Sequence, residues 1–296
     1  MATSDARAPQ ALRALPIRRA VGLNLLRYAV LGCGAFVALL PFLYMIATSL
    51  KSYGETVTRV SALPFHPDFW PAKPMWQNYV VAWNEVNLGR YFANSVVIGA
   101  LTVAGACSTS ALAAYAFAKM RFPGRDAIFA AILGTLIVPE TVMLIPNFII
   151  ISSLGWIDRL AALTVPFLAS AFDIFLLRQF FSQVPNALLE TARIDGSSQF
   201  TTLVRIVVPL AKGPLATVAF LDFLGSWNAL QWPLVVTQSE RWRPISVGLT
   251  RFIAEAGPET QLRLAGATIA LIPVLVVYIV AQRQITEAIS RTGIKG

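Results

Sequence analysis

Apolar residues in this chain are gathered into long runs that are separated by polar segments. Each run is close to the ~20 residues that a helix needs to cross a bilayer. The runs therefore predict an all-α, polytopic membrane protein with six transmembrane helices. They lie at about residues 28–50, 93–118, 127–152, 160–177, 214–237 and 264–281.

Prolines or acids interrupt the last four runs. The interrupting residues are Pro139, Glu140 and Pro146, then Pro166 and Asp173, then Asp222 and Pro233, and finally Pro273. A charged group in hydrocarbon costs roughly 2.5 kcal/mol or more, so Glu140, Asp173 and Asp222 are candidates for a functional role. A structural role is the alternative, because Asp173 stands near the end of its run and Glu140 lies between prolines that break helices.

Composition supports the membrane assignment, since 56% of the residues are hydrophobic, 13% are charged and the mean hydropathy is +0.63. The net charge is +9, but the basic residues stand between the apolar runs and form no patch interleaved with aromatic residues. Such placement is typical of topology signals and gives no reason to expect nucleic acid as a partner. Cys33 and Cys107 both lie inside apolar runs, so a disulfide framework is not expected.

The distribution of basic residues orients the chain. Six crossings place both termini on one side, and that side receives 15 of the 24 Lys and Arg residues. The positive-inside rule therefore predicts that both termini and the segment 181–213 are cytoplasmic. Residues 1–27 hold five Arg and one acid, and we interpret them as a cytoplasmic tail before a single membrane domain at 28–296. An organelle transit peptide is the alternative for the tail.

The cytoplasmic segment after the fourth run predicts a helix, a sharp turn and a second helix. Pro185 can open the first helix, because its missing N–H is not needed there. Gly196 can close that helix in the left-handed conformation. Ser197 or Ser198 can cap the second helix, which Pro209 ends. From composition alone, an ordinary amphipathic loop is the preferred interpretation, and it is the spacing described next that changes this preference.

The spacing within this segment resembles a known signature. In ABC importer permeases the pattern is Glu-Ala-Ala, three residues, Gly, nine residues, Ile, one residue and Leu-Pro. The corresponding residues here are Glu190, Thr191, Ala192, Gly196, Ile206, Val208 and Pro209, with Thr191 in place of Ala and Val208 in place of Leu. Both changes are small in volume.

Other segments resemble the carbohydrate-uptake, maltose-type branch of that family. They are Leu224-Gly225-Ser226-Trp227-Asn228, Trp232-Pro233-Leu234, Asn78-Tyr79, Asn94-Ser95 and the C-terminal Gly293-Ile294-Lys295-Gly296. The similarity extends from about Phe42 to the end of the chain. One departure is Ala229, which stands where an acid commonly follows the Asn.

The resemblance implies a type I ABC importer permease fold in a bacterial plasma (inner) membrane. It also implies a second permease subunit, an ATPase dimer, an extracytoplasmic solute-binding protein and a sugar or sugar-like solute as partners. The chain has no Gly-x-x-x-x-Gly-Lys loop, so it is expected to be no enzyme and to bind no cofactor, with ATP and Mg held by the ATPase. The residues expected to couple to the ATPase, within 185–209, are Glu190, Thr191, Ala192, Asp195, Gly196, Ile206 and Pro209. For Asp195, local capping of the turn is the alternative.

Two further sets of residues follow from this interpretation. Sugars favour aromatic faces and amide hydrogen bonds, so a solute path could involve Trp227, Asn228, Gln231 and Glu140. Ordinary contacts between helices are an equal alternative for each. In related permeases the external loop at 238–263 faces the binding protein, which makes Arg251 and Glu255 the expected contacts.

Two other classes of function compete with the importer. An ion-coupled secondary transporter could use Glu140, Asp173 and Asp222, but it would leave the signature-like loop unexplained. An intramembrane enzyme is disfavoured, because the single histidine, His66, lies in an external Pro-rich segment and no His-Glu-x-x-His or Gly-x-Ser-x-Gly motif is present.

Overall fold

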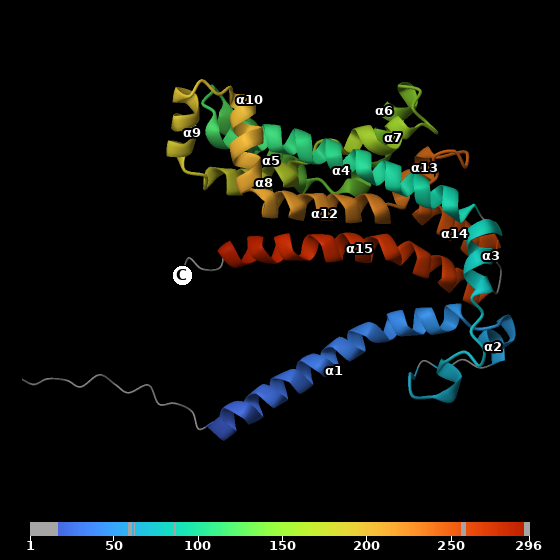
Figure 1. Ribbon diagram of the computed structural model, residues 1–296. Helices are drawn as coiled ribbons and strands as arrows, with labels where there is room; N and C mark the ends of the chain where they lie inside the picture. The colour runs from blue at the N-terminus through green and yellow to red at the C-terminus, as the bar shows by residue number, and fades with distance from the viewer. Residues whose placement is uncertain (1–16, 59–60, 62, 86, 256–258, 293–296) are drawn as a thin grey trace, which may run out of the picture.

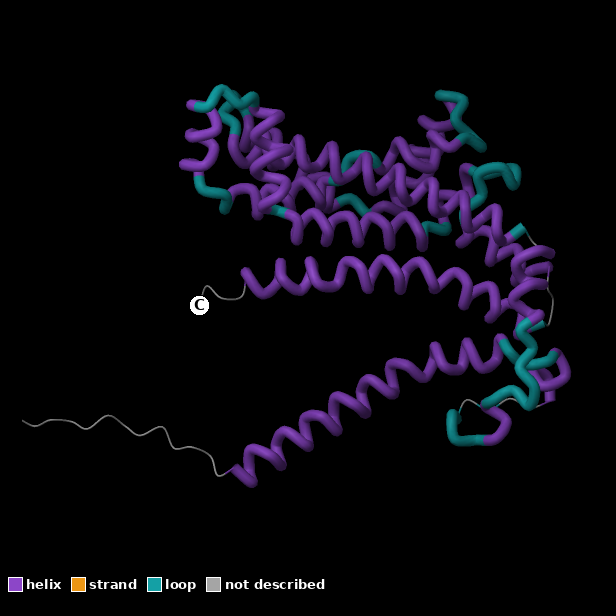
Figure 2. The backbone as a smooth tube through the Cα atoms, viewed as in Figure 1, coloured by secondary structure: helices purple, strands orange, loops and turns teal. Residues whose placement is uncertain are grey.

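The computed structural model describes residues 17–58, 61, 63–85, 87–255 and 259–292. In this part of the chain the fold consists of helices and loops without strands, which confirms the all-α prediction (Figures 1 and 2). Three helices are long and continuous: α1 (Ile17–Ser49), α4 (Leu88–Lys119) and α15 (Thr260–Thr292). The backbone of α1 begins inside the segment predicted as a tail, at Ile17.

Three further apolar stretches are bent pairs of helices. One pair is α5 (Arg125–Gly134) with η2 (Thr135–Ile137), followed by α6 (Glu140–Ser153) at 103°. The second is α7 (Leu160–Thr164) with η3 (Val165–Phe167), followed by α8 (Ala171–Ser182) at 40°. The third is α10 (Gln199–Thr202), η4 (Leu203–Val207) and α11 (Val208–Leu210), followed by α12 (Lys212–Asn228) at 86°. By length and composition, the described residues supply up to six membrane crossings.

The run at 127–152 forms two helices because Pro139 separates them. Val138 and Pro139 are extended, with ψ of 119° and 135°. A proline disfavours the helical conformation of the residue before it and supplies no N–H to the preceding turn. Glu140 then opens α6, where a carboxylate suits the positive end of the helix dipole.

The run at 214–237 is also divided. Helix α12 ends at Asn228, Ala229 is extended with ψ of 121°, and a short helix α13 (Gln231–Val236) follows. Pro233 has no N–H to donate to the carbonyl of Ala229, and the hydroxyl of Ser246 donates to that oxygen instead, at 2.5 Å. The carbonyl that the break leaves without a helical donor is therefore satisfied from another part of the chain.

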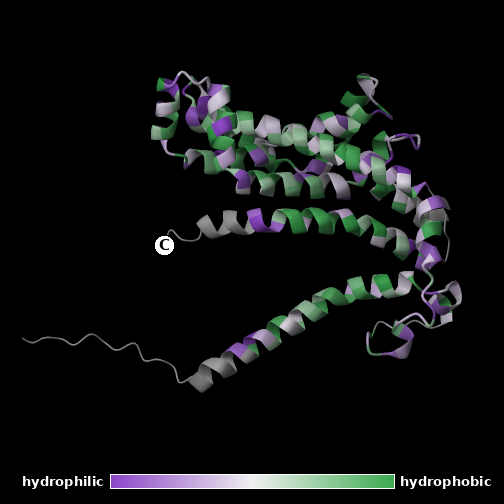
Figure 3. Ribbon diagram, in the orientation of Figure 1, coloured by the Kyte–Doolittle hydropathy of each residue, from purple (hydrophilic) through white to green (hydrophobic). Residues whose placement is uncertain are grey.

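The long helices lie side by side, and their order in space differs from their order in the sequence (Figure 1). Helix α4 packs against α8 and α12, α12 lies between α4 and α15, and α15 contacts α1. Helix α1 diverges from the others over most of its length. The most apolar stretch of this helix is not buried against the rest of the chain. Figure 3 shows that hydrophobic residues, coloured green, make up much of α1 and of α15.

The molecule has two distinct ends. One end, which we call the α14 end, carries short helices: α2 (Tyr53–Thr58), η1 (Pro67–Phe69), α3 (Gln77–Glu85), α13 and α14 (Ile245–Glu255). The opposite end, which we call the α9 end, carries α9 (Asn186–Ile194), α10 and the start of α5. The described ends of α1 and α15 nearest the termini both point toward the α9 end (Figure 1).

Side-chain amides fasten the α14 end. The amide of Asn78 donates to the carbonyls of Ser49 and Lys51, at 2.7 and 2.8 Å, and so caps the end of α1. The amide of Asn94 donates to the carbonyls of Arg241 and Arg243, at 3.0 and 2.9 Å. The two Asn motifs singled out in the sequence are therefore structural ties between α-helices and loops.

Asp158 joins two loops at the same end. It has a left-handed backbone, with φ of 59°, and its Oδ1 accepts the backbone N–H groups of Gln238 and Ser239. Partial burial disfavours its charge, but these hydrogen bonds outweigh that effect and lower the pKa of the Asp158 carboxyl.

The two ends should be exposed on opposite sides of the membrane. Reporter fusions at Arg125, at the start of α5, and at Glu255, at the end of α14, are expected to signal the cytoplasm and the exterior respectively. A fusion at Gln199 serves as a control and should agree with the one at Arg125. The topology is wrong if the fusions at Arg125 and Glu255 report the same compartment.

The packing of α14 on α4 should be sensitive to added volume at Gly248. A Cβ there would lie 2.2 Å from Cδ2 of the buried Tyr91 ring. We expect Gly248→Ala to destabilise the protein by about 1–3 kcal/mol through overpacking. Thermal unfolding in detergent measures this change. Gly225→Ala in α12 is the matched control, because its Cβ would meet nothing within 4 Å, and it should be neutral or stabilising by up to ~1 kcal/mol.

Candidate functional site

The most distinctive local structure is the helix–turn–helix at the α9 end. Helix α9 begins at Asn186, directly after Pro185, and Gly196 follows its end with φ of 76°. The predicted roles of Pro185 and Gly196 in opening and closing this helix are both observed. A Cβ on Gly196 would meet no atom within 4 Å, so the backbone conformation alone is what requires glycine.

The turn after α9 is a Schellman motif. The N–H of Gly196 donates to the carbonyl of Arg193 at 3.0 Å, and the N–H of Ser197 donates to that of Ala192 at 2.9 Å. Two carbonyls of the last helical turn are thereby satisfied. Asp195 occupies the C-cap position and its side chain is exposed.

The second helix of the loop is less regular. The hydroxyl of Ser198 caps it by accepting the N–H of Thr201 at 3.1 Å, so Ser198, one of the two predicted candidates, is the cap. The helix passes through the π-helical turn η4 and continues to Leu210, one residue beyond Pro209, where the sequence predicts its end. Pro209 can leave the carbonyl of Arg205 without its usual donor, and the irregular turn lies directly before it. The chain then bends at Ala211 into α12.

The loop has a buried face and an exposed face. Its buried apolar side chains, Leu189, Ala192, Leu203 and Val207, pack with Ala111, Ala114 and Tyr115 of α4, Leu177 and Phe181 of α8 and Val218 of α12. On the exposed face, Glu190 and Thr191 stand beside uncovered apolar side chains, of which Ile194 is 86% and Phe200 65% exposed. These uncovered apolar side chains are available for contact with another molecule.

The family-signature residues divide between these faces. Ala192 is 5% exposed and Ile206 is half-buried, while Glu190, Thr191, Asp195, Gly196 and Pro209 are exposed. The departure at Thr191 is therefore at the surface, where its hydroxyl donates to the carbonyl of Ala187 at 2.9 Å. The departure at Val208 lies against the edge of the buried cluster, where its volume is close to that of Leu.

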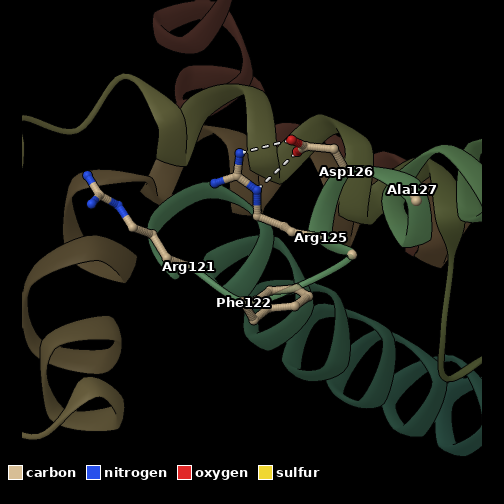
Figure 4. A pocket seen from close by; sticks show the side chains of 6 residues that line it. Arg121, Phe122, Arg125, Asp126 and Ala127 are labelled. Atoms are coloured by element: carbon tan, nitrogen blue, oxygen red, sulfur yellow. Dashed lines mark hydrogen bonds and ion pairs between the residues drawn. The ribbon is translucent and has the colours of Figure 1, made fainter.

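A second feature of the α9 end is the turn between α4 and α5 (Figure 4). It lines a cavity of about 450 Å³ with Arg121, Phe122, Arg125 and Asp126. Nε of Arg125 lies 3.0 Å from Oδ1 of Asp126, while Arg121 extends away from that pair (Figure 4). Of the basic residues of this turn, Arg121 is exposed and Arg125 is half-buried, and both lie at the same end as the helix–turn–helix.

Trp227 lies in a packed cluster between helices. Its side chain is 3% exposed, its ring stacks on Phe223 with centroids 5.4 Å apart, and its Nε1 donates to the carbonyl of Ala270 at 3.1 Å. In this structure it is a contact between α12 and α15, and a part for it in a solute path stays a prediction.

The other expected path residues are exposed on separate elements. Asn228 ends α12, Gln231 begins α13 and Glu140 begins α6. Each therefore stands at a break in an apolar run. For the loop at 238–263, the side chains of Arg251 and Glu255 lie outside the described residues, although their backbone belongs to α14.

Asp173 and Asp222 face each other between α8 and α12, with Cys107 of α4 nearby. Asp173 is 2% exposed, and Oδ2 of each carboxyl is buried without a hydrogen-bond partner among the described residues. The hydroxyl of Ser170 accepts the N–H of Asp173 at the start of α8, 3.2 Å away. The sequence singled out each acid separately, and nothing in their spacing predicted that they pair.

Sequence reasoning also missed the polar side chains that attach the helix–turn–helix to α4. They are Tyr115 and Lys119 on α4 and Gln199 on α10. The four-residue separation of Tyr115 and Lys119 was a visible signal, because residues i and i+4 share one face of a helix.

Comparison with known proteins gives a consistent picture. The family described as binding-protein-dependent transport system inner membrane component matches residues 106–291. The chain is 29% identical to the diacetylchitobiose uptake system permease protein NgcG of Streptomyces coelicolor, covering 89% of this chain and 86% of that protein. It is 32% identical to the sn-glycerol-3-phosphate transport system permease protein UgpE of Yersinia enterocolitica, covering 88% and 94%.

A solved structure shares the fold. It is a bacterial ABC transporter involved in the import of the acidic polysaccharide alginate, and one of its chains superposes with a TM-score of 0.80. The identity is 24%, and the alignment covers 91% of this chain and 99% of the other. The ABC importer permease fold predicted from the sequence is thereby confirmed.

The pair of buried acids should tolerate the loss of one charge. Two carboxylates close together in a medium of low dielectric constant repel each other. Asp222→Asn keeps the volume and removes one charge, so we expect thermal unfolding in detergent at an unchanged or higher temperature. Asp222→Leu, which also removes the polar atoms beside Asp173, is the comparison and should unfold at a lower temperature. If Asp222→Asn lowers the unfolding temperature as much as Asp222→Leu does, the charge itself is needed and the repulsion argument is wrong.

Proposed function

The chain belongs to the family of binding-protein-dependent transport system inner membrane components, and from this premise we propose that it imports a sugar or sugar-like solute. It is a multi-pass inner-membrane permease subunit, and the ATPase is a separate subunit. The family match over residues 106–291 is the observation that carries this function. The proposal concerns the solute, the partners and the contacts.

The class of solute follows from the relatives. NgcG is named for diacetylchitobiose and UgpE for sn-glycerol-3-phosphate, and the structurally similar transporter takes part in alginate import. All three solutes are rich in hydroxyl groups, although only some carry a charge. These names support a hydroxyl-rich solute for this chain and do not select one.

The solute path is proposed to run along the breaks in the apolar runs. Asn228, Gln231 and Glu140 are exposed at such breaks and offer amide and carboxylate groups to a hydroxyl-rich solute. Trp227 would reach the solute only if the packing of α12 on α15 changed, because its ring is covered in this structure.

The partners proposed are a second permease subunit, an ATPase dimer that holds ATP and Mg, an external binding protein and membrane lipid. The most apolar stretch of α1 is not buried within the chain, which supports a second permease subunit or lipid beside this helix. The loop at 238–263, with Arg251 and Glu255, is proposed to face the binding protein. The bias of basic residues toward the α9 end supports a cytoplasmic location for that end and for both termini.

The helix–turn–helix is proposed to dock on the ATPase through the loop 185–209. Its exposed apolar side chains, including Ile194 and Phe200, offer a surface for a partner to cover. Glu190, exposed on the same helix, is available to a basic or amide group of the partner. A rigid helix that is held in this way can convert closure of the ATPase into movement of the spans.

The ion-coupled alternative is set aside. It was based on Glu140, Asp173 and Asp222, but members of this family work with a separate ATPase. The positions of the acids agree with structural roles: Glu140 opens a helix, and Asp173 lies in the first turn of α8, opposite Asp222.

Substitution of Gly196 or Glu190 should separate ATP hydrolysis from uptake. Gly196→Val forces a β-branched residue into φ of 76°, which strains the turn by roughly 1–2 kcal/mol and tilts α9. Glu190→Lys reverses a charge on the proposed docking surface. In proteoliposomes that hold the whole complex, both variants should insert and assemble but lose most ATP-dependent sugar uptake.

Two milder substitutions are the matched controls. Gly196→Asn should retain more uptake than Gly196→Val, because Asn tolerates the left-handed conformation. Glu190→Gln keeps the size and one acceptor oxygen without introducing a positive charge. Normal uptake in both Gly196→Val and Glu190→Lys would contradict the docking proposal.

A further inference from the structure

One face of α4 reaches the helix–turn–helix at two separate points. Tyr115 and Lys119 are four residues apart at the cytoplasmic end of α4, so their side chains leave the helix on the same side. Tyr115 contacts Gln199 at the start of α10, just beyond the turn that follows α9, and Lys119 contacts the chain before α9. The two residues therefore meet the loop at opposite ends of its first helix.

The contact of Lys119 closes the junction between α8 and α9. Its Nζ donates to the carbonyl of Val184 at 2.6 Å, to Oδ1 of Asn186 at 3.0 Å and to the carbonyl of Ser182 at 3.3 Å. An ammonium group has three donors, and all three are used here. Ser182 ends α8 and Asn186 begins α9, so one cation holds the end of one helix to the start of the next.

The contact of Tyr115 passes through Gln199. The hydroxyl of Tyr115 lies 2.8 Å from the side-chain amide of Gln199 on α10. When the amide nitrogen of Gln199 is directed to that hydroxyl, the amide oxygen accepts hydrogen bonds from Nη2 and Nε of Arg193 on α9, at 2.9 and 3.2 Å. The amide of Gln199 thus links α4, α10 and α9 at one place.

Apolar packing alone does little to hold α9 in position. The helix has 9 residues, and only Leu189 and Ala192 are buried. A helix of this length is only marginally stable in isolation. The burial of two side chains does little to fix the direction of the helix axis. The polar contacts at its two ends therefore have a large share in setting its orientation.

We propose that Tyr115 and Lys119 are positioning residues that hold α9 at two points, so that its displacement by the ATPase is passed to α4. The proposal rests on the proposed function, in which the ATPase docks on this loop. A helix that is attached at one point can pivot about that point without moving the spans. A helix that is attached at both ends has to carry α4 with it.

The test uses the complete complex in proteoliposomes, with ATP hydrolysis and sugar uptake measured together. Lys119→Met removes the three donors and keeps the length of the side chain, and Tyr115→Phe removes only the hydroxyl. Both variants should hydrolyse ATP in response to the loaded binding protein. The ATP used per solute imported should rise by roughly threefold to tenfold, the range expected when one or two hydrogen bonds are lost.

Conservative variants and a matched control separate positioning from folding. Lys119→Arg keeps donors for the junction, and Gln199→Glu keeps acceptors for the Tyr115 hydroxyl and for Arg193, so both variants should retain the wild-type ratio. Lys212→Met makes the same change at an exposed lysine of α12 for which the described residues show no hydrogen bond, and its ratio should not change. A role in folding alone would lower assembly and thermal stability and leave the ratio of ATP to solute as it is.

A distance measurement gives a second readout. Spin labels at Ala187 of α9 and Leu112 of α4, in a background with Cys33 and Cys107 replaced by Ser, should give one narrow distance distribution in the parent. Tyr115→Phe and Lys119→Met should broaden it. If Lys119→Met does not assemble, Tyr115→Phe and Gln199→Ala decide the outcome.

The results distinguish the two levels of the proposal. A parent complex that shows no ATP-dependent uptake would refute the proposed function itself. If the parent is coupled, and the variants keep both its ratio of ATP to solute and its narrow distance distribution, the two-point attachment is refuted while the importer function stands.

Discussion

Every backbone N–H and C=O group in the hydrocarbon region of a bilayer needs a partner within the protein, because lipid offers none. Continuous helices such as α4 meet this condition by themselves. The apolar runs that are divided into two helices do not, so each break requires a side chain from elsewhere or an exposed end. The carbonyl of Ala229 shows the first solution, since the hydroxyl of Ser246 donates to it where Pro233 cannot. The positions of the breaks therefore constrain which loops have to lie beside which helices.

The sequence predicted the features that depend on local physics. The apolar runs indicated helices that cross the membrane, and Gly196 indicated a left-handed turn, because those outcomes follow from hydropathy and from the missing Cβ. The family of the chain was predicted from the spacing of the residues from Glu190 to Pro209, and the comparisons confirmed it. The bounds of the membrane domain and the roles assigned to individual site residues stay predictions.

Features that depend on tertiary packing were not visible in the same way. A Trp beside an Asn in an apolar run could line a path or fill a core, and only the ring stacking and the Nε1 hydrogen bond of Trp227 place it in the core here. Asp173 and Asp222 are far apart in the sequence, and their meeting depends on how α8 packs on α12. Pro139 indicated that the helix over 127–152 is interrupted. The angle of 103° between the two resulting parts, α5 with η2 and α6, could not be predicted from the proline.

The two ends of the molecule are held by different chemistry, and this difference bears on how movement can pass through it. At the α14 end, the amides of Asn78 and Asn94 bind backbone carbonyls of neighbouring segments, which ties α1 and the loops to fixed positions. At the α9 end, the cation of Lys119 and the hydroxyl of Tyr115 hold a short helix whose own packing is slight. Because α4 takes part at both ends, through Asn94 and through this pair, it is the one described span that touches both sets of ties. A rotation imposed on α9 would therefore reach the α14 end most directly through α4.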